Sequence, residues 1–314
     1  MVKPFIIGTR NARDMLRYGA EILREGGSAM DAIEAAVRAV EDNPLDSGVG
    51  LGGTPNLLGV PQMDASIMDG RTLGTGAVAA LEGYRHAISV ARKVLEVSPH
   101  VLIVGPGAAM FAKLMGFEES ELLTDRSRAV YKAFLEDAID DLDESFASSK
   151  EYYKEYITKY KLRELYAKLA NKQQGTVNIM ALDGNGDMCS GVSTSGTAFK
   201  FPGRVGDSPI IGAGNYCDNR FGSAACTGRG ELAIRLSTAR TIISYMENGK
   251  GVEDACIQAM KDIHALGDTG SMNCIAFDKD GNTMSASTNR ESIHYYMDVD
   301  SDGPEERKGI LVKG

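Results

Sequence analysis

The 314-residue chain has no tryptophan, only four histidines, and five cysteines of which none forms a CxxC pair. No histidine lies in an HExxH motif or beside a GxSxG motif. Clustered histidines and carboxylates at zinc-ligand spacing are also missing. These absences give little support to a metal-dependent amidase or to one built on a Ser-His-Asp triad. We expect no cofactor and no metal, and the cysteines are expected to be buried free thiols.

The chain also lacks an apolar run of the roughly 20 residues that a transmembrane helix needs. Basic residues are in the minority, because 34 Lys and Arg face 43 Asp and Glu and the formal net charge is -9. Nucleic acids and anionic membranes attract basic surfaces, so neither is an expected partner. The apolar part of residues 1–8 is too short for a signal peptide, and we expect a cytoplasmic protein.

Hydrophobic residues make up 43% of the chain, enough for a sizeable core in one or two domains. Their periodicity predicts an N-terminal set of elements and, after residue 175, two hairpins with helices between them. Strands interleaved with helices in this order indicate sheets with helices packed outside, an α+β fold. The predicted strands are 3–9, 63–68, 74–81 and a buried 101–104; the helices are 11–25, 28–40, 87–96, 230–248 and 252–265; the hairpins are 176–194 and 274–287.

Two segments differ from this pattern. Residues 47–59 are rich in glycine and are interpreted as an ordered turn near an active site, because no Lys-Ser/Thr pair follows as a phosphate-binding loop requires. Residues 127–172 are rich in Asp, Glu, Lys and Tyr and predict two solvated helices, which end in a polar tail at 171–174. The acidic residues among the lysines argue against an RNA-binding face. A polar tail of this kind is a place where a chain can be exposed and cut.

A chain with so few histidines needs another general base. A terminal α-amine has an unperturbed pKa of about 7.7–8.0, so a chain that begins with threonine carries nucleophile and base on one residue. The pair Gly175-Thr176 follows the polar tail and opens a predicted strand. Taken alone, the simpler interpretation is that Thr176 only begins that strand.

Five sequence blocks change this balance, because together they resemble the Thr-dependent asparaginases. That family includes glycosylasparaginase and the isoaspartyl peptidase/L-asparaginases. Residues 64–70, 76–78 and 99–105 look like the family's α-chain, so the resemblance covers nearly the whole sequence. The five blocks are Thr176-Val177, Ser193-Thr194-Ser195-Gly196, Gly203-Arg204-Val205-Gly206-Asp207-Ser208-Pro209, Gly212-Ala213-Gly214 and Thr227-Gly228-Arg229-Gly230-Glu231.

The resemblance implies that the precursor cuts itself between Gly175 and Thr176. The implied products are an α-chain, 1–175, and a β-chain, 176–314, within one domain. The implied fold is the four-layer αββα sandwich of the N-terminal-nucleophile hydrolases, and the implied assembly is a dimer of αβ units. Thr176 would attack the side-chain amide of a small β-aspartyl substrate and form a β-aspartyl ester.

The resemblance also implies roles for other residues. Thr194 would bond to the nucleophile region, and Thr227 with the Gly228 amide would form the oxyanion hole. Without the family, Thr227-Gly228 could be only a helix N-cap.

Two charged residues complete the implied site. Arg204 would bind the substrate α-carboxylate, because a guanidinium matches two carboxylate oxygens. Asp207 would hold the α-ammonium together with the Gly230 carbonyl. Without the family, Arg204 and Asp207 could simply pair with each other.

The sequence departs from the family pattern at three places. Gly175 stands where many glycosylasparaginases have Asp, Asn178 stands where the family usually has Gly, and the first strand has Gly8-Thr9-Arg10 where glycosylasparaginases carry a Trp. We therefore favour isoaspartyl dipeptides and L-asparagine as substrates, with N4-(β-N-acetylglucosaminyl)-L-asparagine as the alternative. An uncleaved, non-catalytic binding protein is the alternative of another class.

Overall fold

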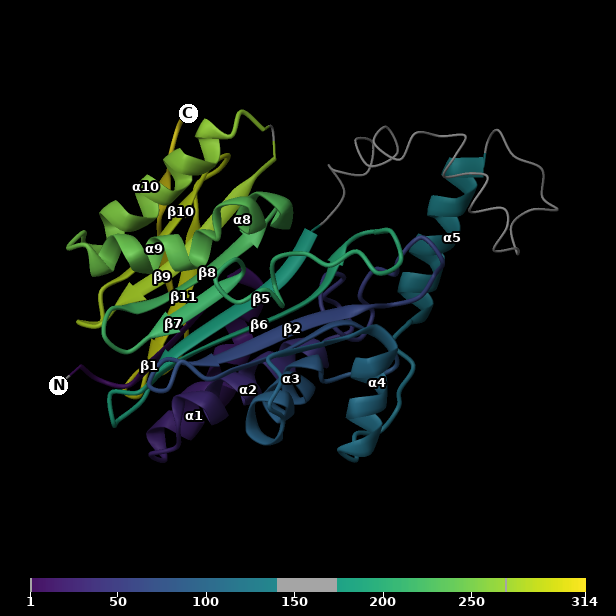
Figure 1. Cartoon of the computed structure of the whole chain (residues 1–314), viewed down its shortest axis with the longest axis horizontal. Helices are drawn as coiled ribbons and strands as arrows, with labels where there is room; N and C mark the ends of the chain where they lie inside the picture. The colour runs from purple at the N-terminus through teal and green to yellow at the C-terminus, as the bar shows by residue number, and fades with distance from the viewer. Residues whose placement is uncertain (1, 140–173, 269) are drawn as a thin grey trace.

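Two β-sheets lie face to face in the computed structural model, which describes residues 2–139, 174–268 and 270–314 (Figure 1). The larger sheet contains the strand that begins at Gln174, the last residue of the polar tail 171–174. In spatial order its strands are β12 (Glu305–Lys308), β11 (Ile293–Asp298), β1 (Phe5–Gly8), β5 (Gln174–Leu182), β6 (Met188–Thr197), β2 (Met63–Asp69), β3 (Thr75–Leu81) and β4 (Leu102–Val104). The smaller sheet is β13 (Ile310–Leu311), β10 (Thr283–Ser287), β9 (Met272–Asp278), β8 (Gly222–Gly228) and β7 (Asn215–Asp218).

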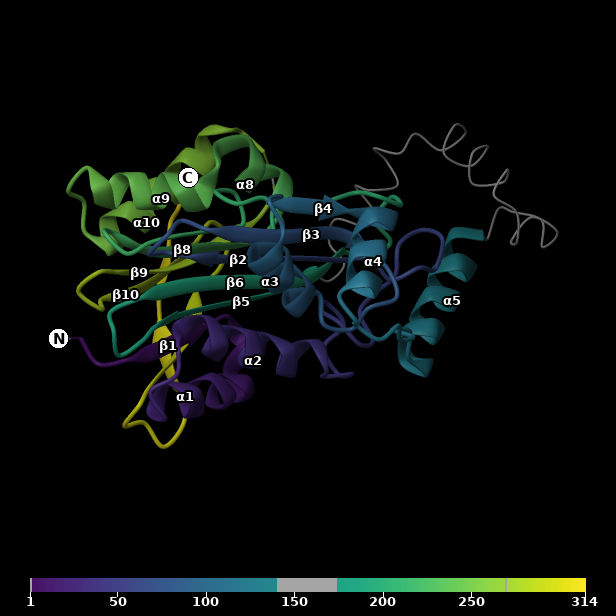
Figure 2. The same cartoon turned by 60° about the horizontal axis from the view of Figure 1, so that its bottom comes forward.

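Helices cover the outer face of each sheet, as both views show (Figures 1 and 2). On the larger sheet these are α1 (Leu16–Arg24), which follows the 3-10 helix η1 (Arg10–Met15), α2 (Ala29–Glu41) and α3 (Ala87–Val97). On the smaller sheet they are α8 (Gly230–Leu236), α9 (Thr238–Glu247) and α10 (Val252–Ala265). Helix α4 (Gly105–Leu114) packs against β3 and β4, and α5 (Asp125–Ile139) lies farther from both sheets (Figure 2).

The alternation of side chains along β1 explains why the sheets stack. Successive residues of a strand point to opposite faces. Ile6 therefore joins the apolar cluster beneath the helices, whereas Phe5 and Ile7 join the cluster between the sheets. There Phe5 meets Phe277 of β9 edge-on, with ring centroids 4.9 Å apart. A strand buried on both faces is apolar throughout, as its sequence FIIG is.

Most predicted elements are confirmed, and all five cysteines are free and buried. The predicted helix 230–248 is wrong as one helix, because Ser237 adopts a left-handed backbone (φ 48°) that separates α8 from α9. The Gly212 carbonyl accepts from the Arg240 amide in the first turn of α9. The loop before β7 therefore determines the direction of the α9 axis. Residues 231–248 include no glycine or proline, so the sequence did not predict this break.

The predicted buried strand 101–104 is also wrong in its burial. It is the edge strand β4, where Val104 is 53% exposed. Helix α4 directly after it was not predicted. Of the two helices expected in 127–172, the first corresponds to α5, and the second lies outside the described residues. In the described part of the chain, no helix combines the length and apolar character needed to cross a membrane.

Candidate active site

Thr176 lies at an irregularity in the pairing of β5 with β6. Gly175 pairs with Gly196, but the next regular pair is Val177 with Ser193, so two residues of β6, Thr194 and Ser195, stand opposite Thr176 and the bulge is on β6. A bulge interrupts the alternation of side chains and turns one of them in a new direction, which is why bulges often occur beside active sites. The half-buried Thr176 lies opposite this bulge and lines a cavity.

The hydroxyl of Thr194 connects the Thr176 side chain with the carbonyl before it. Thr194 Oγ1 donates to the Gly175 carbonyl oxygen at 2.5 Å and accepts from the Gly196 amide at 2.9 Å. A hydroxyl has one proton and two lone pairs, so it can still accept from Thr176 Oγ1, which lies 3.3 Å away. The Thr176 hydroxyl, the carbonyl that precedes it and a donor to that carbonyl are thus neighbours.

The backbones of Gly48 and Gly175 touch at this point. A Cβ added to Gly175 would lie 2.2 Å from Gly48 Cα, and one added to Gly48 would lie 2.1 Å from Gly175 Cα. Gly48 is held in place by its amide, which donates to Asp46, and by its carbonyl, which accepts from the Ser195 amide. The crossing explains why glycine, and not aspartate, precedes Thr176 in this chain. It also confirms that the glycine-rich segment 47–59 runs beside the Thr176 cavity.

Asn178, the departure from the family pattern, reaches across to the smaller sheet. Its side chain is completely buried, and Nδ2 donates to the Cys226 carbonyl at 2.9 Å and to Thr227 Oγ1 at 2.8 Å. A carbonyl can only accept, so the Cys226 bond defines which end of the amide is nitrogen. Thr227 is then an acceptor toward Asn178, and its own proton is free to point elsewhere. Sequence reasoning noted Asn178 but missed this contact.

Thr176 and Thr227 border the same cavity of about 370 Å³. Gly175, Gly48 and Asn273 also line it. Asn273 donates to the Thr227 carbonyl at 3.2 Å, so the end of β8 is held on both sides. The lining combines hydroxyls, amides and backbone with four charged side chains, which suits a small polar substrate more than an apolar one.

A second cluster contains the predicted charged residues. Asp207 is 5% exposed, its Oδ2 has no partner among the described residues, and burial raises its pKa to about 7. Gly230 lies against it, since a Cβ there would be 2.6 Å from Asp207 Oδ1. Arg204 does not pair with Asp207. Its Nε and Nη2 donate instead to Glu231 Oε1 at 3.1 and 2.8 Å, a partner that sequence reasoning missed.

The chain from 227 to 230 joins the two clusters. Thr227 and Gly228 end β8, and Gly230 begins α8. The N-cap of α8 is Arg229, so the interpretation of Thr227-Gly228 as a helix cap is wrong. Gly228 has φ 139° and packs against the Ser271 carbonyl, which leaves no room for a side chain. At one end of this segment the Thr227 hydroxyl borders the cavity. At the other end Gly230 contacts the buried Asp207 carboxyl.

A threonine hydroxyl that is bonded to a second hydroxyl beside a polar cavity is the arrangement that hydrolases with a hydroxyl nucleophile require. The comparisons agree with this class. A family model described as asparaginase (Asparaginase_2) matches residues 8–304, and the chain belongs to this family of amidohydrolases.

Three relatives illustrate the range of the family. A plant-type L-asparaginase of Pyrococcus furiosus is 38% identical over 279 residues, 89% of this chain and 86% of its own. An isoaspartyl peptidase/L-asparaginase of Homo sapiens is 40% identical over 240 residues, 76% of this chain and 70% of its own. An N(4)-(beta-N-acetylglucosaminyl)-L-asparaginase of Elizabethkingia miricola is 37% identical over 263 residues, 83% of this chain and 69% of its own.

Proposed function

We propose that this chain cuts itself between Gly175 and Thr176 and then uses Thr176 to hydrolyse the side-chain amide of L-aspartyl substrates. The main support is the position of Thr176 opposite the bulge on β6, where it lies 3.3 Å from the Thr194 hydroxyl, which also donates to the Gly175 carbonyl. Two relatives carry the names L-asparaginase and isoaspartyl peptidase, which describe reactions of this class.

Self-cleavage would be an N-to-O acyl shift. Thr176 Oγ1 bonds to the Gly175 carbonyl carbon, the carbon–nitrogen bond breaks, and the hydroxyl proton passes to the nitrogen. Water then hydrolyses the ester to give chains 1–175 and 176–314. The Thr194 hydroxyl already points at the oxygen that becomes negative, and such a donor lowers the barrier without reorganising.

Turnover repeats the same chemistry on a substrate. The new α-amine of Thr176, with an ordinary pKa of about 7.7–8.0, takes the hydroxyl proton as Oγ1 attacks the amide carbonyl. The proton passes to the departing amine or ammonia, which leaves a β-aspartyl ester on Thr176. Water adds to this ester and releases aspartate. Thr227 and the Gly228 amide would supply the oxyanion hole, with Asn178 directing the Thr227 proton toward the cavity.

The charged cluster would hold the aspartyl part of the substrate. Arg204 would bind the α-carboxylate, which replaces the Glu231 carboxylate that it contacts in the free chain. Asp207 and the Gly230 carbonyl would bind the α-ammonium. A buried carboxyl with one unpartnered oxygen is costly to ionise, and a cationic ligand supplies the charge that it lacks.

Three structural proposals accompany this function. The two facing sheets and their outer helices correspond to the four-layer αββα sandwich of the N-terminal-nucleophile hydrolases. The whole of 1–314 would form one such domain, and two αβ units would assemble as a dimer. The apolar cluster between the sheets supports the first two proposals, because it spans strands from both sides of the proposed cut.

The test is the fate of the purified chain and of Thr176→Ala. We expect denaturing electrophoresis of the wild type to resolve two fragments, with the smaller one beginning at Thr176, and turnover of L-asparagine or a β-aspartyl dipeptide. Thr176→Ala should stay one 33.6 kDa chain and lose more than about 10⁴-fold of the activity. Thr176→Ser keeps a hydroxyl and should still be cut. An intact wild-type chain without activity would instead favour a binding protein.

The alternative substrate is N4-(β-N-acetylglucosaminyl)-L-asparagine, which the relative from Elizabethkingia miricola is named for. It shares the aspartyl part and differs only in the leaving group. Comparing kcat/KM for this compound, L-asparagine and a β-aspartyl dipeptide separates the two assignments. The glycosylasparaginase assignment requires the sugar amide to be the best of the three.

A further inference from the structure

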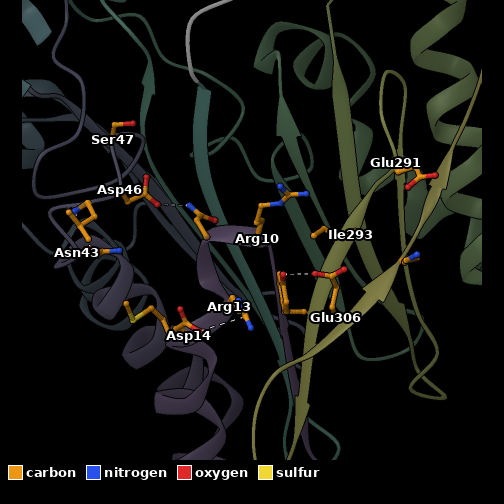
Figure 3. A pocket seen from close by; sticks show the side chains of 14 residues that line it. Arg10, Arg13, Asp14, Asn43, Asp46, Ser47, Glu291, Ile293 and Glu306 are labelled. Carbon is orange, nitrogen blue, oxygen red and sulfur yellow. Dashed lines mark hydrogen bonds and ion pairs between the residues drawn. The ribbon is translucent and has the colours of Figure 1, made fainter.

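A second cavity adjoins the one at Thr176. Its volume is about 770 Å³, and it opens between η1, the loop after α2 and the β11–β12 edge of the larger sheet (Figure 3). Six residues line both cavities, so the two are continuous; they are Arg10, Asn11, Asp46, Ser47, Glu291 and Ile293. The charged cluster of Arg204 and Asp207 lines neither cavity. The outer chamber is therefore available to the part of a substrate on the other side of the scissile amide.

Most charged groups in this chamber are already engaged (Figure 3). Asp46 accepts from the Asn11 side chain and the Gly48 amide, each at 2.8 Å. Glu306 accepts from the Tyr295 hydroxyl at 2.7 Å. Arg13 lies 5.6 Å over the Tyr295 ring and 3.8 Å from Asp14.

Among the described residues, Arg10 is the unpaired cation that lines both cavities, whereas Lys308 lines only the outer one and Arg290 only the inner one. Arg10 is exposed and begins η1, directly after the strand β1 that pairs with β5. Among the described residues, its guanidinium has neither an ion pair nor a side-chain hydrogen bond. A guanidinium offers five N–H donors in a planar fork, and here they face the chamber between Asp46 and Ile293 (Figure 3). Arg290 and Glu291 also lack ion pairs within the described chain, but their opposite charges offset each other at the inner cavity.

We propose that this chamber is a leaving-group subsite in which Arg10 binds the free α-carboxylate of an amino acid. The preferred substrates are then β-aspartyl dipeptides. The inference rests on the proposed function, because it requires the aspartyl part to be bound at Arg204 and Asp207. A carboxylate is the group whose two oxygens match the guanidinium fork.

The chamber fits this leaving group better than the alternatives. Ammonia, the leaving group of L-asparagine, would leave the outer volume and the Arg10 donors unused. A sugar is usually held by an exposed aromatic face and by neutral hydrogen bonds. The one aromatic residue among the lining residues, Tyr295, is 6% exposed and has Arg13 over its ring.

The experiment compares Arg10→Gln with the wild type on three substrates: β-aspartyl-leucine, its C-terminal amide and L-asparagine. A charge-assisted hydrogen bond contributes enough for roughly a 10- to 100-fold change in affinity. We expect kcat/KM for β-aspartyl-leucine to fall by this factor relative to L-asparagine, mainly through KM. In the wild type the C-terminal amide should be the poorer dipeptide by a similar factor, and Arg10→Gln should remove that difference.

Arg13→Gln is the matched control, because it removes a guanidinium from the same chamber that is already engaged. Its preference for β-aspartyl-leucine over the amide should stay within about twofold of the wild type. The proposal is overturned if Arg10→Gln keeps the wild-type preference, or if wild-type enzyme favours the sugar amide over the dipeptide. Failure of the proposed function looks different, since the wild type would then turn over none of these compounds.

Discussion

The two clusters of the site are built in opposite ways. The groups in contact with Thr176 and Thr227 are neutral hydroxyls and amides, and most have partners inside the chain, although the buried Asn178 Oδ1 has none among the described residues. Around Asp207 the groups are charged, and one buried carboxylate oxygen has no partner among the described residues. In the proposed function the first cluster has its geometry before substrate binds, whereas the second would be completed by the α-ammonium of the substrate.

This difference follows from the order of events in the proposed function. The Thr176 cluster would act first on the chain itself, so its geometry has to exist before any substrate arrives. The Asp207 cluster has no role in that step. Its buried carboxyl can therefore remain without a partner until the substrate binds. An unpaired buried charge lowers the stability of the fold, and an opposite charge in the ligand offsets this cost.

The largest effect is expected at the neutral cluster. Thr227→Val should lower kcat by about 10²–10³, the typical cost of one oxyanion-hole donor. Asn178→Ala should lower kcat about 10-fold, because the Thr227 hydroxyl loses the donor that orients it. Steady-state kinetics on the cleaved enzymes measures both.

The double variant gives the sharper result. In the Thr227→Val background, Asn178→Ala should have almost no further effect on kcat, since the two residues act through one hydroxyl. Additive losses would mean that Asn178 supports the enzyme by packing alone, and a melting temperature for each variant separates that case.

The next effect concerns the charged cluster and depends on pH. Burial raises the pKa of Asp207 to about 7, so the free enzyme has the anionic form mostly above pH 7. Asp207→Asn should lower kcat/KM by roughly 100-fold at pH 8, where the lost group is charged. At pH 6 the loss should be clearly smaller, because the wild-type carboxyl is then largely neutral. An equal loss at both values would show that the Asp207 charge is not what the substrate meets.

The smallest effect is expected beneath the neutral cluster. Glu41 is fully buried, accepts from Ser193 at 2.6 Å and from the Ile88 amide at 3.0 Å, and burial raises its pKa from 4.5 to about 8. A pKa raised by folding means that the native state keeps a proton which the unfolded chain loses. Its contribution to stability is complete below pH 4.5 and is lost as pH rises to about 8.

Glu41→Gln imitates the protonated side chain and should flatten this dependence. In the uncut Thr176→Ala background, we expect the variant to melt a few degrees higher than its parent at pH 8, and the two to agree near pH 4.5. If the melting temperatures of parent and variant change with pH in parallel across this range, the assignment to Glu41 is contradicted. Thermal unfolding followed by circular dichroism is sufficient.

Much of the architecture could be predicted because it depends on local pattern. The run from 176 to 194 is a hairpin in which a turn separates two apolar strands, and the structure has β5 and β6 there. Apolar periodicity likewise located α2 and α10. The motif blocks around Thr176, Arg204 and Thr227 identified the family, because the residues of each block are contiguous in the sequence.

Other features could not be predicted, since they depend on residues that are distant in sequence. The break at Ser237 follows from a loop carbonyl that bonds to α9. The exposure of β4 follows from its place at the edge of the sheet. Arg204 was expected to meet Asp207 or a substrate, and its contact with Glu231 arises because α8 begins beside it.

The sequence alone determined the family, the alternation of strands and helices, and the threonine on which the proposed chemistry depends. Only the tertiary structure decided how that threonine is held. The crossing of Gly48 with Gly175 and the bond from Asn178 to Thr227 join segments that local periodicity leaves independent. Strand register and sheet stacking bring such segments together, and both are set by the packing of the whole core.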